Sequence, residues 1–205
     1  MIVLWDRGIL LMVNTQKTSL LSLLFNIAYS AYHIGLGVWS NSWWLFTIGI
    51  YYAILSLIRF AVLRTRQNSF FLIRFTGAML MLLSLPLIGT VILSVIRDRG
   101  KVMHIIVMIT IAAYTFTKIT FAIINLARLR KGSSAKLIAL RNISLADSCV
   151  SIFALQRSML VSFPGMADGD IRIMNAVFGS VICIIVFILG YNLIRNEKFW
   201  FKSIK

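Results

Sequence analysis

Two charged residues in the apolar parts of this 205-residue sequence, Asp147 and Lys118, are the best candidates for chemistry. Asp147 is the only carboxylate within a segment long and apolar enough to span a bilayer, and Lys118 is the only basic residue near the middle of one. Placing a charge in hydrocarbon costs a few kcal/mol or more, so such residues are usually paired or functional. Each lies about ten residues, or about 15 Å of helix, from the polar loop 128–136. Adjacent antiparallel helices would therefore bring Lys118 and Asp147 to the same depth as an ion pair, either a static strut or a point where substrate or proton enters.

Three apolar segments carry their polar residues on one face of a helix. At about 100° per residue, the stripe of segment 137–160 consists of Ser144, Asp147, Ser148, Ser151 and Ser158. Segment 18–38 has a comparable stripe with Ser22, Asn26, Tyr29, Ser30 and His33, and segment 103–127 has one with His104, Tyr114, Thr115, Lys118 and Asn125. Lipid offers these side chains no hydrogen-bond partners, so the stripes must face protein or water. We therefore expect the other helices to pack around segment 137–160.

These stripes predict a solute or ion pathway lined by segments 18–38, 103–127 and 137–160. The candidate residues are Asn26, Tyr29, His33, Arg74, Tyr114, Lys118, Ser144, Asp147, Ser148 and Ser151. Arg74 is included because it lies one turn inside segment 70–96, whereas Arg59, Arg141 and Arg157 are near enough to span ends to reach headgroups. The excess of Arg74, Lys118 and Arg141 over Asp147 favours an anionic or zwitterionic solute. Alternatively, the same stripes are interhelical hydrogen bonds, each worth about 0.6 to 2 kcal/mol.

The composition indicates an all-α, polytopic membrane protein. Hydrophobic residues make up 60% of the chain and charged residues 13%, and a soluble domain of this size could not bury so much apolar surface. Apolar runs of about 20 residues, the length that crosses a bilayer, predict six transmembrane helices. The predicted spans are 18–38, 43–63, 70–96 with a kink at Pro86, 103–127, 137–160 and 173–194. A single membrane domain thus covers 1–205, with an interfacial helix over 1–17 and a basic, aromatic tail over 195–205.

The distribution of basic residues predicts the orientation. Twelve Lys and Arg residues fall on one side of the predicted spans, and four, Arg97, Arg99, Lys101 and Arg172, fall on the other. Because cytoplasmic loops carry the excess of Lys and Arg, both termini should be cytoplasmic in the cell membrane. The net charge of +15 then indicates contact with anionic lipid headgroups rather than nucleic acid.

Two sequence similarities suggest an internal repeat. FAVLRTRQNSF (60–70) matches FALQRSMLVSF (153–163), and AYSAYHIG (28–35) matches AYTFTKIT (113–120), at equivalent places in units 18–96 and 103–194. Three spans per unit would make the two units inverted in the membrane, as in many transporters.

Catalytic and metal-binding signatures are lacking in the sequence. No two carboxylates share a predicted span, and no HExxH or GxSxG motif is present. We expect no enzyme activity, no cofactor and no metal, and we interpret Cys149 and Cys183 as apolar packing residues. Two hypotheses remain: a small transporter or channel, or a non-transporting accessory, sensory or immunity subunit whose stripes hold helices together. A homo-oligomer or a partner membrane protein is compatible with both.

Overall fold

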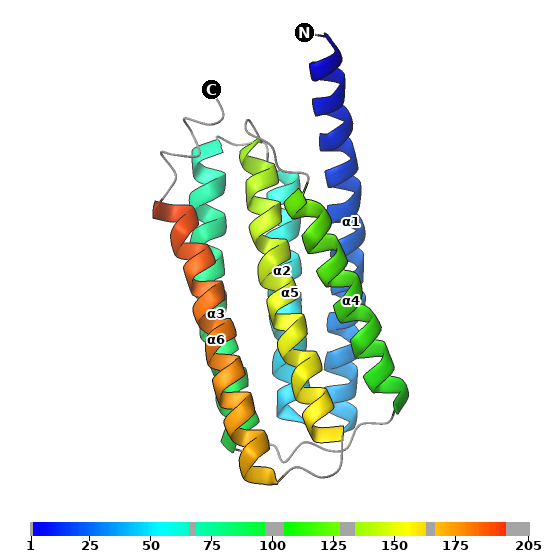
Figure 1. The fold of residues 1–205 in the computed structure, drawn as a ribbon, viewed down its shortest axis with the longest axis vertical. Coiled ribbons are helices and arrows are strands. Elements are labelled where there is room, and N and C mark those ends of the chain that lie inside the picture. The colour runs from blue at the N-terminus through cyan, green and yellow to red at the C-terminus, as the bar shows by residue number, and fades with distance from the viewer. Residues whose placement is uncertain (1, 66–68, 97–104, 128–133, 163–166, 196–205) are drawn as a thin grey trace.

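The computed structural model describes residues 2–65, 69–96, 105–127, 134–162 and 167–195, and within these ranges every regular element is an α-helix. The helices are α1 (Ile2–Trp39), α2 (Trp43–Arg64), α3 (Ser69–Ile96), α4 (Ile105–Ala127), α5 (Ala135–Ser162) and α6 (Asp168–Arg195). All six are long and apolar enough to span a membrane. They form an elongated bundle in which α1 begins and α6 ends at the same end (Figure 1), which we call the terminal end; the opposite end is the distal end. The predicted all-α fold with six helices long and apolar enough to span a membrane is confirmed.

Helix α1 differs from the prediction at its N-terminus. It runs unbroken from Ile2, so the predicted separate helix over 1–17 is the beginning of α1. Its 38 residues span about 57 Å, whereas the hydrocarbon core is about 30 Å thick. Within the part of α1 whose side chains are described, Ser19–Trp39 qualifies as a membrane span, and the earlier turns of α1 extend past the other helices at the terminal end (Figure 1). Asp6 and Arg7 interrupt the apolar run but not the helix. A charged side chain is unfavourable in lipid, but it does not prevent the backbone from being helical.

A short turn joins α1 to α2 at the distal end. Asn41 adopts a φ of 52°, a left-handed conformation that Asn tolerates better than most residues. Ser42 is the N-cap residue of α2, and Trp43 is exposed beside it. An exposed tryptophan at a span end suits a membrane interface, as the sequence predicted for the start of this helix.

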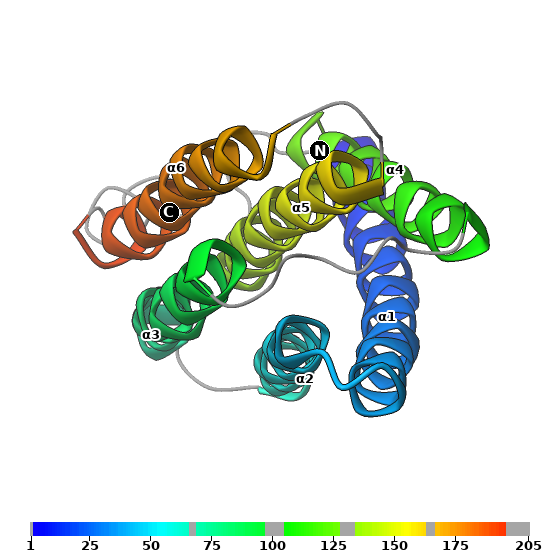
Figure 2. The same cartoon turned by 90° about the horizontal axis from the view of Figure 1, so that it is seen from below.

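Helix α5 lies at the centre of the bundle. It packs against each of the other five helices, and its span is the most buried of the six. Seen along the bundle axis, α3 and α6 lie to one side of α5, α1 and α4 to the other, and α2 closes one edge (Figure 2). The expectation that the other helices pack around segment 137–160 is therefore confirmed.

Helices α3 and α6 approach each other closely at a pair of glycines. A Cβ atom added to Gly190 would lie 2.7 Å from the carbonyl oxygen of Gly77, and one added to Gly77 would lie 2.8 Å from that of Gly190. Glycine at both positions thus lets the two backbones touch, as small residues do in membrane helix pairs. Helix α3 continues through Pro86, so this proline does not end the helix.

Candidate functional site

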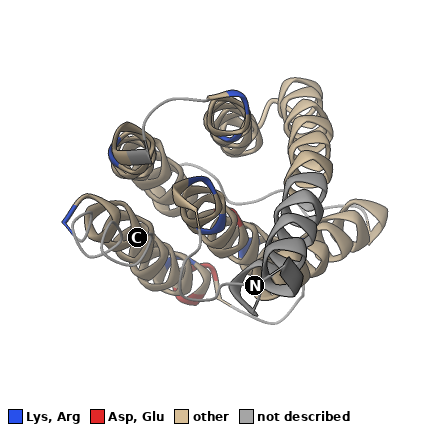
Figure 3. Cartoon of the chain, turned by 90° about the horizontal axis from the view of Figure 1, so that it is seen from above, with Lys and Arg blue, Asp and Glu red and all other residues tan. Residues whose placement is uncertain are grey.

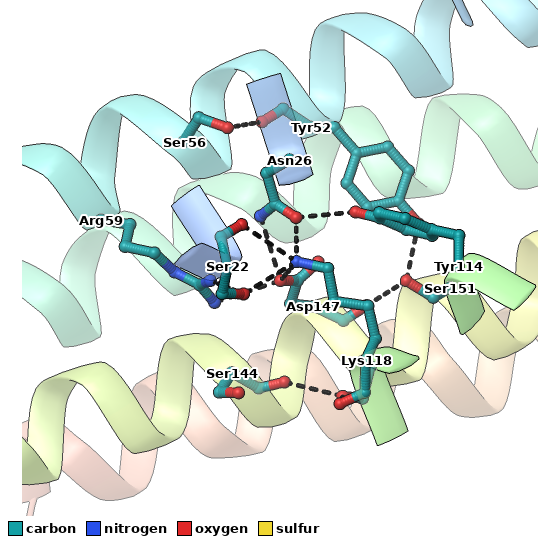
Figure 4. A network of polar contacts seen from close by, with 11 residues as sticks. Ser22, Asn26, Tyr52, Ser56, Arg59, Tyr114, Lys118, Ser144, Asp147 and Ser151 are labelled. Atoms are coloured by element: carbon teal, nitrogen blue, oxygen red, sulfur yellow. Dashed lines mark hydrogen bonds and ion pairs between the residues drawn. The ribbon is translucent and has the colours of Figure 1, made fainter. Parts of the chain in front are cut away.

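Six polar residues from four helices meet inside the bundle, and we call them the charge cluster. They are Ser22 and Asn26 of α1, Arg59 of α2, Tyr114 and Lys118 of α4, and Asp147 of α5 (Figure 4). Asp147 lies twelve residues after the start of α5 and fifteen before its end, at about 18 and 22 Å of helix. The charge cluster is therefore close to the middle of the membrane span.

Asp147 accepts three hydrogen bonds through one oxygen. Its Oδ2 atom lies 2.5 Å from Lys118 Nζ, 3.0 Å from Asn26 Nδ2 and 3.1 Å from Arg59 Nη2. The predicted Lys118–Asp147 ion pair is confirmed, and Arg59 makes a second ion pair with the same oxygen. The other oxygen, Oδ1, is buried and has no hydrogen-bond partner among the described residues. One acceptor of the central carboxylate is thus left unused by the described part of the chain.

Lys118 connects the carboxylate to α1. Its ammonium group donates to Ser22 Oγ at 3.0 Å and also to Asn26 Oδ1. Tyr114, one turn away on α4, donates its hydroxyl proton to the same Asn26 oxygen at 2.6 Å. Asn26 therefore uses both ends of its amide, and it links the carboxylate to a tyrosine hydroxyl and an ammonium group.

The charge cluster contains more positive than negative charge. Arg59 and Lys118 are each 2% exposed and Asp147 is 0% exposed, so two cations share one carboxylate away from water. Across the described residues, the buried charged side chains are these three and Arg157. A surplus cation in a low-dielectric interior is unfavourable unless an anion compensates it.

Arg59 is the charged member of the charge cluster that the sequence did not predict; Ser22 was on a predicted stripe but not among the candidate residues. It lies five residues before the end of α2, a position from which we expected it to reach lipid headgroups. The structure instead turns it into the bundle, on the same face as Tyr52 and Ser56. The i, i+4, i+7 spacing of these three polar residues was the available signal.

Four aromatic rings form a second group on the distal side of the charge cluster. The Tyr29 and Tyr114 rings stack at 3.5 Å between centroids, and His33 and Tyr52 lie 4.2 and 5.1 Å from Tyr29. Tyr29 and His33 belong to α1, as predicted for the pathway face. Within the described residues, the Tyr29 hydroxyl and both His33 ring nitrogens are buried without a hydrogen-bond partner. This ring group therefore borders the charge cluster through Tyr114.

The serines of α5 mostly serve backbone contacts. Ser151 Oγ donates to the Asp147 carbonyl at 2.8 Å, so the Tyr52 hydroxyl, 3.0 Å away, donates to Ser151. Ser148 Oγ lies 3.0 Å from the Lys118 carbonyl and ties α5 to α4, as does Thr115 through the Ser151 carbonyl. Ser144 is buried on the same stripe, and its carbonyl accepts from Ser148. These small side chains let α4 approach α5 closely.

Arg74 lies apart from the charge cluster. It is exposed near the start of α3, with its guanidinium 4.9 Å from the centre of the Phe70 ring. The sequence placed it in the pathway because it is one turn inside a span, but its face of α3 is turned outward. His104 lies outside the described residues, as does the Asn125 side chain.

The described residues contain no group of three His, Cys, Asp or Glu side chains suited to a metal ion. No protein-family model matches the chain, and no curated protein matches its sequence. Fold and site together define a six-helix membrane protein with a buried, net-positive polar cluster at the middle of its bundle.

Proposed function

We propose that the chain is a small membrane transporter or channel for an anionic or zwitterionic solute, with the charge cluster as its binding site. The observation that carries this proposal is the charge balance, with Arg59 and Lys118 buried around the single carboxylate of Asp147. A solute carboxylate or similar anion would neutralise the surplus cation. The unused Oδ1 atom of Asp147 would accept a hydrogen bond from a donor on the same solute, as an ammonium group of a zwitterion provides.

The pathway in this proposal runs between α1, α4 and α5, with α2 added because it supplies Arg59. On the distal side it passes the ring group, where Tyr29 stacks on Tyr114. On the terminal side it passes Ser22, which accepts hydrogen bonds from both Arg59 and Lys118. In this proposal, the stacked rings are the barrier that a solute must pass on the distal side.

An inverted repeat remains part of the proposal, in a register different from the one that the sequence suggested. Phe60 is exposed whereas its sequence match Phe153 is buried, so the pairing of 60–70 with 153–163 puts unlike positions together. Arg59 and Arg157 match better, because both are buried and each lies five residues before the end of its helix. The contacts of α1 with α2 and of α2 with α3 have counterparts in α4 with α5 and in α5 with α6. The contact of α3 with α5 departs from this symmetry, because its counterpart would be a contact of similar extent between α6 and α2.

The proposed orientation places the terminal end in the cytoplasm of a cell membrane. Among the described residues, Arg64, Arg74 and Lys136 lie at or near helix ends there, and Arg195 is in the last turn of α6. Figure 3 looks onto this end and shows basic positions on several helices. Arg172 is near the distal end of α6. Six of the sixteen Lys and Arg residues in the sequence count belong to the loops 97–104 and 128–133, which lie outside the described residues.

Flux into proteoliposomes tests the function. Purified protein would be assayed for uptake of a radiolabelled panel consisting of acetate, lactate, phosphate, glutamate and glycine. We expect uptake of at least one of these, an uptake rate at least tenfold lower in Lys118→Met, and a rate within twofold of the native one in Arg195→Gln, which removes an exposed cation. Folded protein that transports no member of the panel, or Lys118→Met at the native rate, would count against the proposal.

The accessory-subunit hypothesis has one observation in its favour. The charge cluster joins four helices through hydrogen bonds within the chain, as a structural strut would. Under that hypothesis, Asp147→Asn combined with Lys118→Met keeps the physiological function once stability has recovered. Under the transport proposal, the same double variant is folded but does not transport.

A further inference from the structure

His33 of α1 is a buried histidine in the ring group. It is 0% exposed, and neither of its ring nitrogens has a hydrogen-bond partner among the described residues. A neutral imidazole offers one N–H donor and one lone pair, and both are unused here. Histidine changes its charge near neutral pH more readily than other side chains do, and an ionisable residue within a membrane span marks a candidate functional site. The lone pair of His33 can therefore bind a proton inside the bundle.

The titratable side chains that face the His33 ring are tyrosines. They are Tyr29 and Tyr32 of α1, Tyr52 of α2 and, through the stacked Tyr29 ring, Tyr114 of α4. The centre of the His33 ring is 4.2 Å from that of Tyr29 and 6.4 Å from that of Tyr52. On α5, the buried charged residues are Asp147, in the charge cluster, and Arg157, which lies 4.1 Å from the Trp44 ring rather than at the lipid headgroups that the sequence predicted. Tyrosine is neutral at ordinary pH, so a proton on His33 would meet no opposite charge within the ring group itself.

The position of His33 along α1 places it between the charge cluster and the distal end. It lies six residues before the end of α1, or about 9 Å of helix, whereas Asn26 lies thirteen residues before that end, or about 20 Å. Helix α1 ends at Trp39, on the distal side (Figure 1). A proton needs a lone pair rather than a cavity, so the close packing of the rings does not prevent it from binding. A proton that enters from the distal side thus meets His33 before it meets the charge cluster.

The charge of the cluster links this proton to an anionic solute. Without a solute, Arg59, Lys118 and Asp147 carry a net charge of +1, which opposes a further positive charge on His33 in a low-dielectric interior. A bound solute anion would bring the cluster to zero and remove this repulsion, whereas a zwitterion without net charge would leave it in place. Because coupling between two binding sites is reciprocal, an anion that favours proton binding is itself bound more tightly when the proton is present.

We propose that His33 is a proton-binding site on the distal side of the charge cluster and that its proton is transported together with a solute anion. The lone pair of the imidazole takes a proton from the distal side, and the anion binds to the charge cluster. Both leave on the terminal side, which returns His33 to its neutral form. The coupling rests on the proposed transport function and narrows its substrate class to anions, whereas the proton site itself does not depend on transport.

Nuclear magnetic resonance of isotope-labelled histidine tests the proton site in full-length protein in lipid nanodiscs. The chain has two histidines, His33 and His104, so the imidazole signals that His33→Phe removes belong to His33. If His33→Phe does not fold, His104→Gln provides the assignment. The nitrogen chemical shifts distinguish imidazole from imidazolium, and we expect His33 to become protonated reversibly as the pH is lowered. At a fixed pH within this titration, adding glutamate or lactate, whichever the protein transports, should raise the protonated fraction, and glycine should not. An imidazole that stays neutral until the protein unfolds overturns the site.

Proton movement into liposomes tests the coupling. With a pH-sensitive dye enclosed, uptake of radiolabelled glutamate or lactate should acidify the lumen, relative to liposomes without protein. His33→Phe keeps a ring against Tyr29 but has no lone pair, and it should lower the number of protons per anion at least tenfold. Arg172→Gln, which removes an exposed cation near the distal end, should leave that number within twofold.

The outcomes separate this inference from the transport proposal. Anion uptake without acidification overturns the coupling and leaves transport intact. A number of protons per anion that His33→Phe leaves within twofold of the native value overturns the role of His33. If neither anion is taken up, the coupling fails together with the transport proposal, and reversible protonation of His33 in nanodiscs still supports the proton site.

Discussion

The carboxylate of Asp147 is used asymmetrically, and this determines how substitutions in the charge cluster should behave. Three donors converge on Oδ2, while Oδ1 has no hydrogen-bond partner among the described residues. The two cations that share Oδ2 leave the trio of Arg59, Lys118 and Asp147 with a net charge of +1. Removing the carboxylate raises this charge to +2, whereas removing the ammonium group lowers it to zero.

Asp147→Asn should therefore destabilise the protein much more than Lys118→Met. The first leaves two buried cations without a counter-charge, and breaking a buried pair in this way costs about 3 to 5 kcal/mol. The second leaves a one-to-one pair of Arg59 and Asp147. Thermal unfolding in detergent should show a clear fall in Tm for Asp147→Asn, a small change for Lys118→Met and partial recovery in the double variant. Equal losses of Tm in the two single variants would mean that the charge balance does not control stability.

A tyrosine pair tests the value of one hydrogen bond in the charge cluster. Tyr114→Phe removes the hydroxyl that donates to Asn26 Oδ1 and should cost about 1 kcal/mol. Tyr51→Phe is the matched control, because the Tyr51 hydroxyl is buried without a hydrogen-bond partner among the described residues. Its loss should leave stability unchanged or slightly higher. The difference in Tm between the two variants in detergent measures the bond, and a lower Tm for Tyr51→Phe than for Tyr114→Phe would contradict the assignment.

For single residues, the sequence predicted how deep a side chain lies in the membrane span. It predicted only partly which side of its helix the side chain faces. The Lys118–Asp147 pair followed from equal distances to a shared loop, and the structure contains it. Asn26, Tyr29, His33 and Tyr114 followed from helical periodicity, and they lie in or beside the charge cluster. Arg59 was expected at the lipid headgroups and Arg74 in the pathway, but Arg59 lies in the charge cluster and Arg74 is exposed. Distance from a span end does not determine whether an arginine faces lipid or the bundle.

At the scale of the elements, the helices themselves were predictable because a bilayer imposes their length. The predicted spans end within a few residues of the helices, apart from the beginning of α1 and of α6. Hydropathy locates where a helix must be apolar, but it does not locate where the helix stops. A helix also continues where charged residues interrupt the apolar run, as α1 does at Asp6 and Arg7.

The contact between α3 and α6 should depend on Gly77. Gly77→Ala would place a Cβ 2.8 Å from the Gly190 carbonyl oxygen, so the two helices must separate. Overpacking of this kind costs about 1 to 3 kcal/mol and should lower the Tm in detergent. Gly89→Ala on the same helix is the control, because no atom lies within 4 Å of the added Cβ. There, alanine should leave the Tm unchanged or raise it, since glycine is the poorer helix former by about 1 kcal/mol. A lower Tm for Gly89→Ala than for Gly77→Ala would refute this account.

At the scale of the whole molecule, the central position of α5 was predictable from its polar stripe, and the order of the helices around it was not. A stripe requires protein neighbours but does not specify which helix provides each of them. The pairing of α3 with α6 depends on backbone contact at Gly77 and Gly190. A glycine hardly changes the hydropathy or the polar pattern of a segment, so neither signal indicates this contact. Such contacts are decided by shape complementarity between two surfaces, and a single sequence does not display that complementarity.

The orientation of the bundle is the last prediction, and it follows from the basic residues at the terminal end. In a background with Cys149 and Cys183 replaced by Ala, single cysteines would be introduced as Gly169→Cys and Arg64→Cys. Gly169 is exposed at the distal end with open space around it, and Arg64 is exposed in the last turn of α2 at the terminal end. Because the positive-inside rule places the terminal end in the cytoplasm, a membrane-impermeant maleimide should label the Gly169→Cys variant in intact cells and the Arg64→Cys variant only after permeabilisation. Labelling of the Arg64→Cys variant in intact cells, with the Gly169→Cys variant protected, would reverse the orientation.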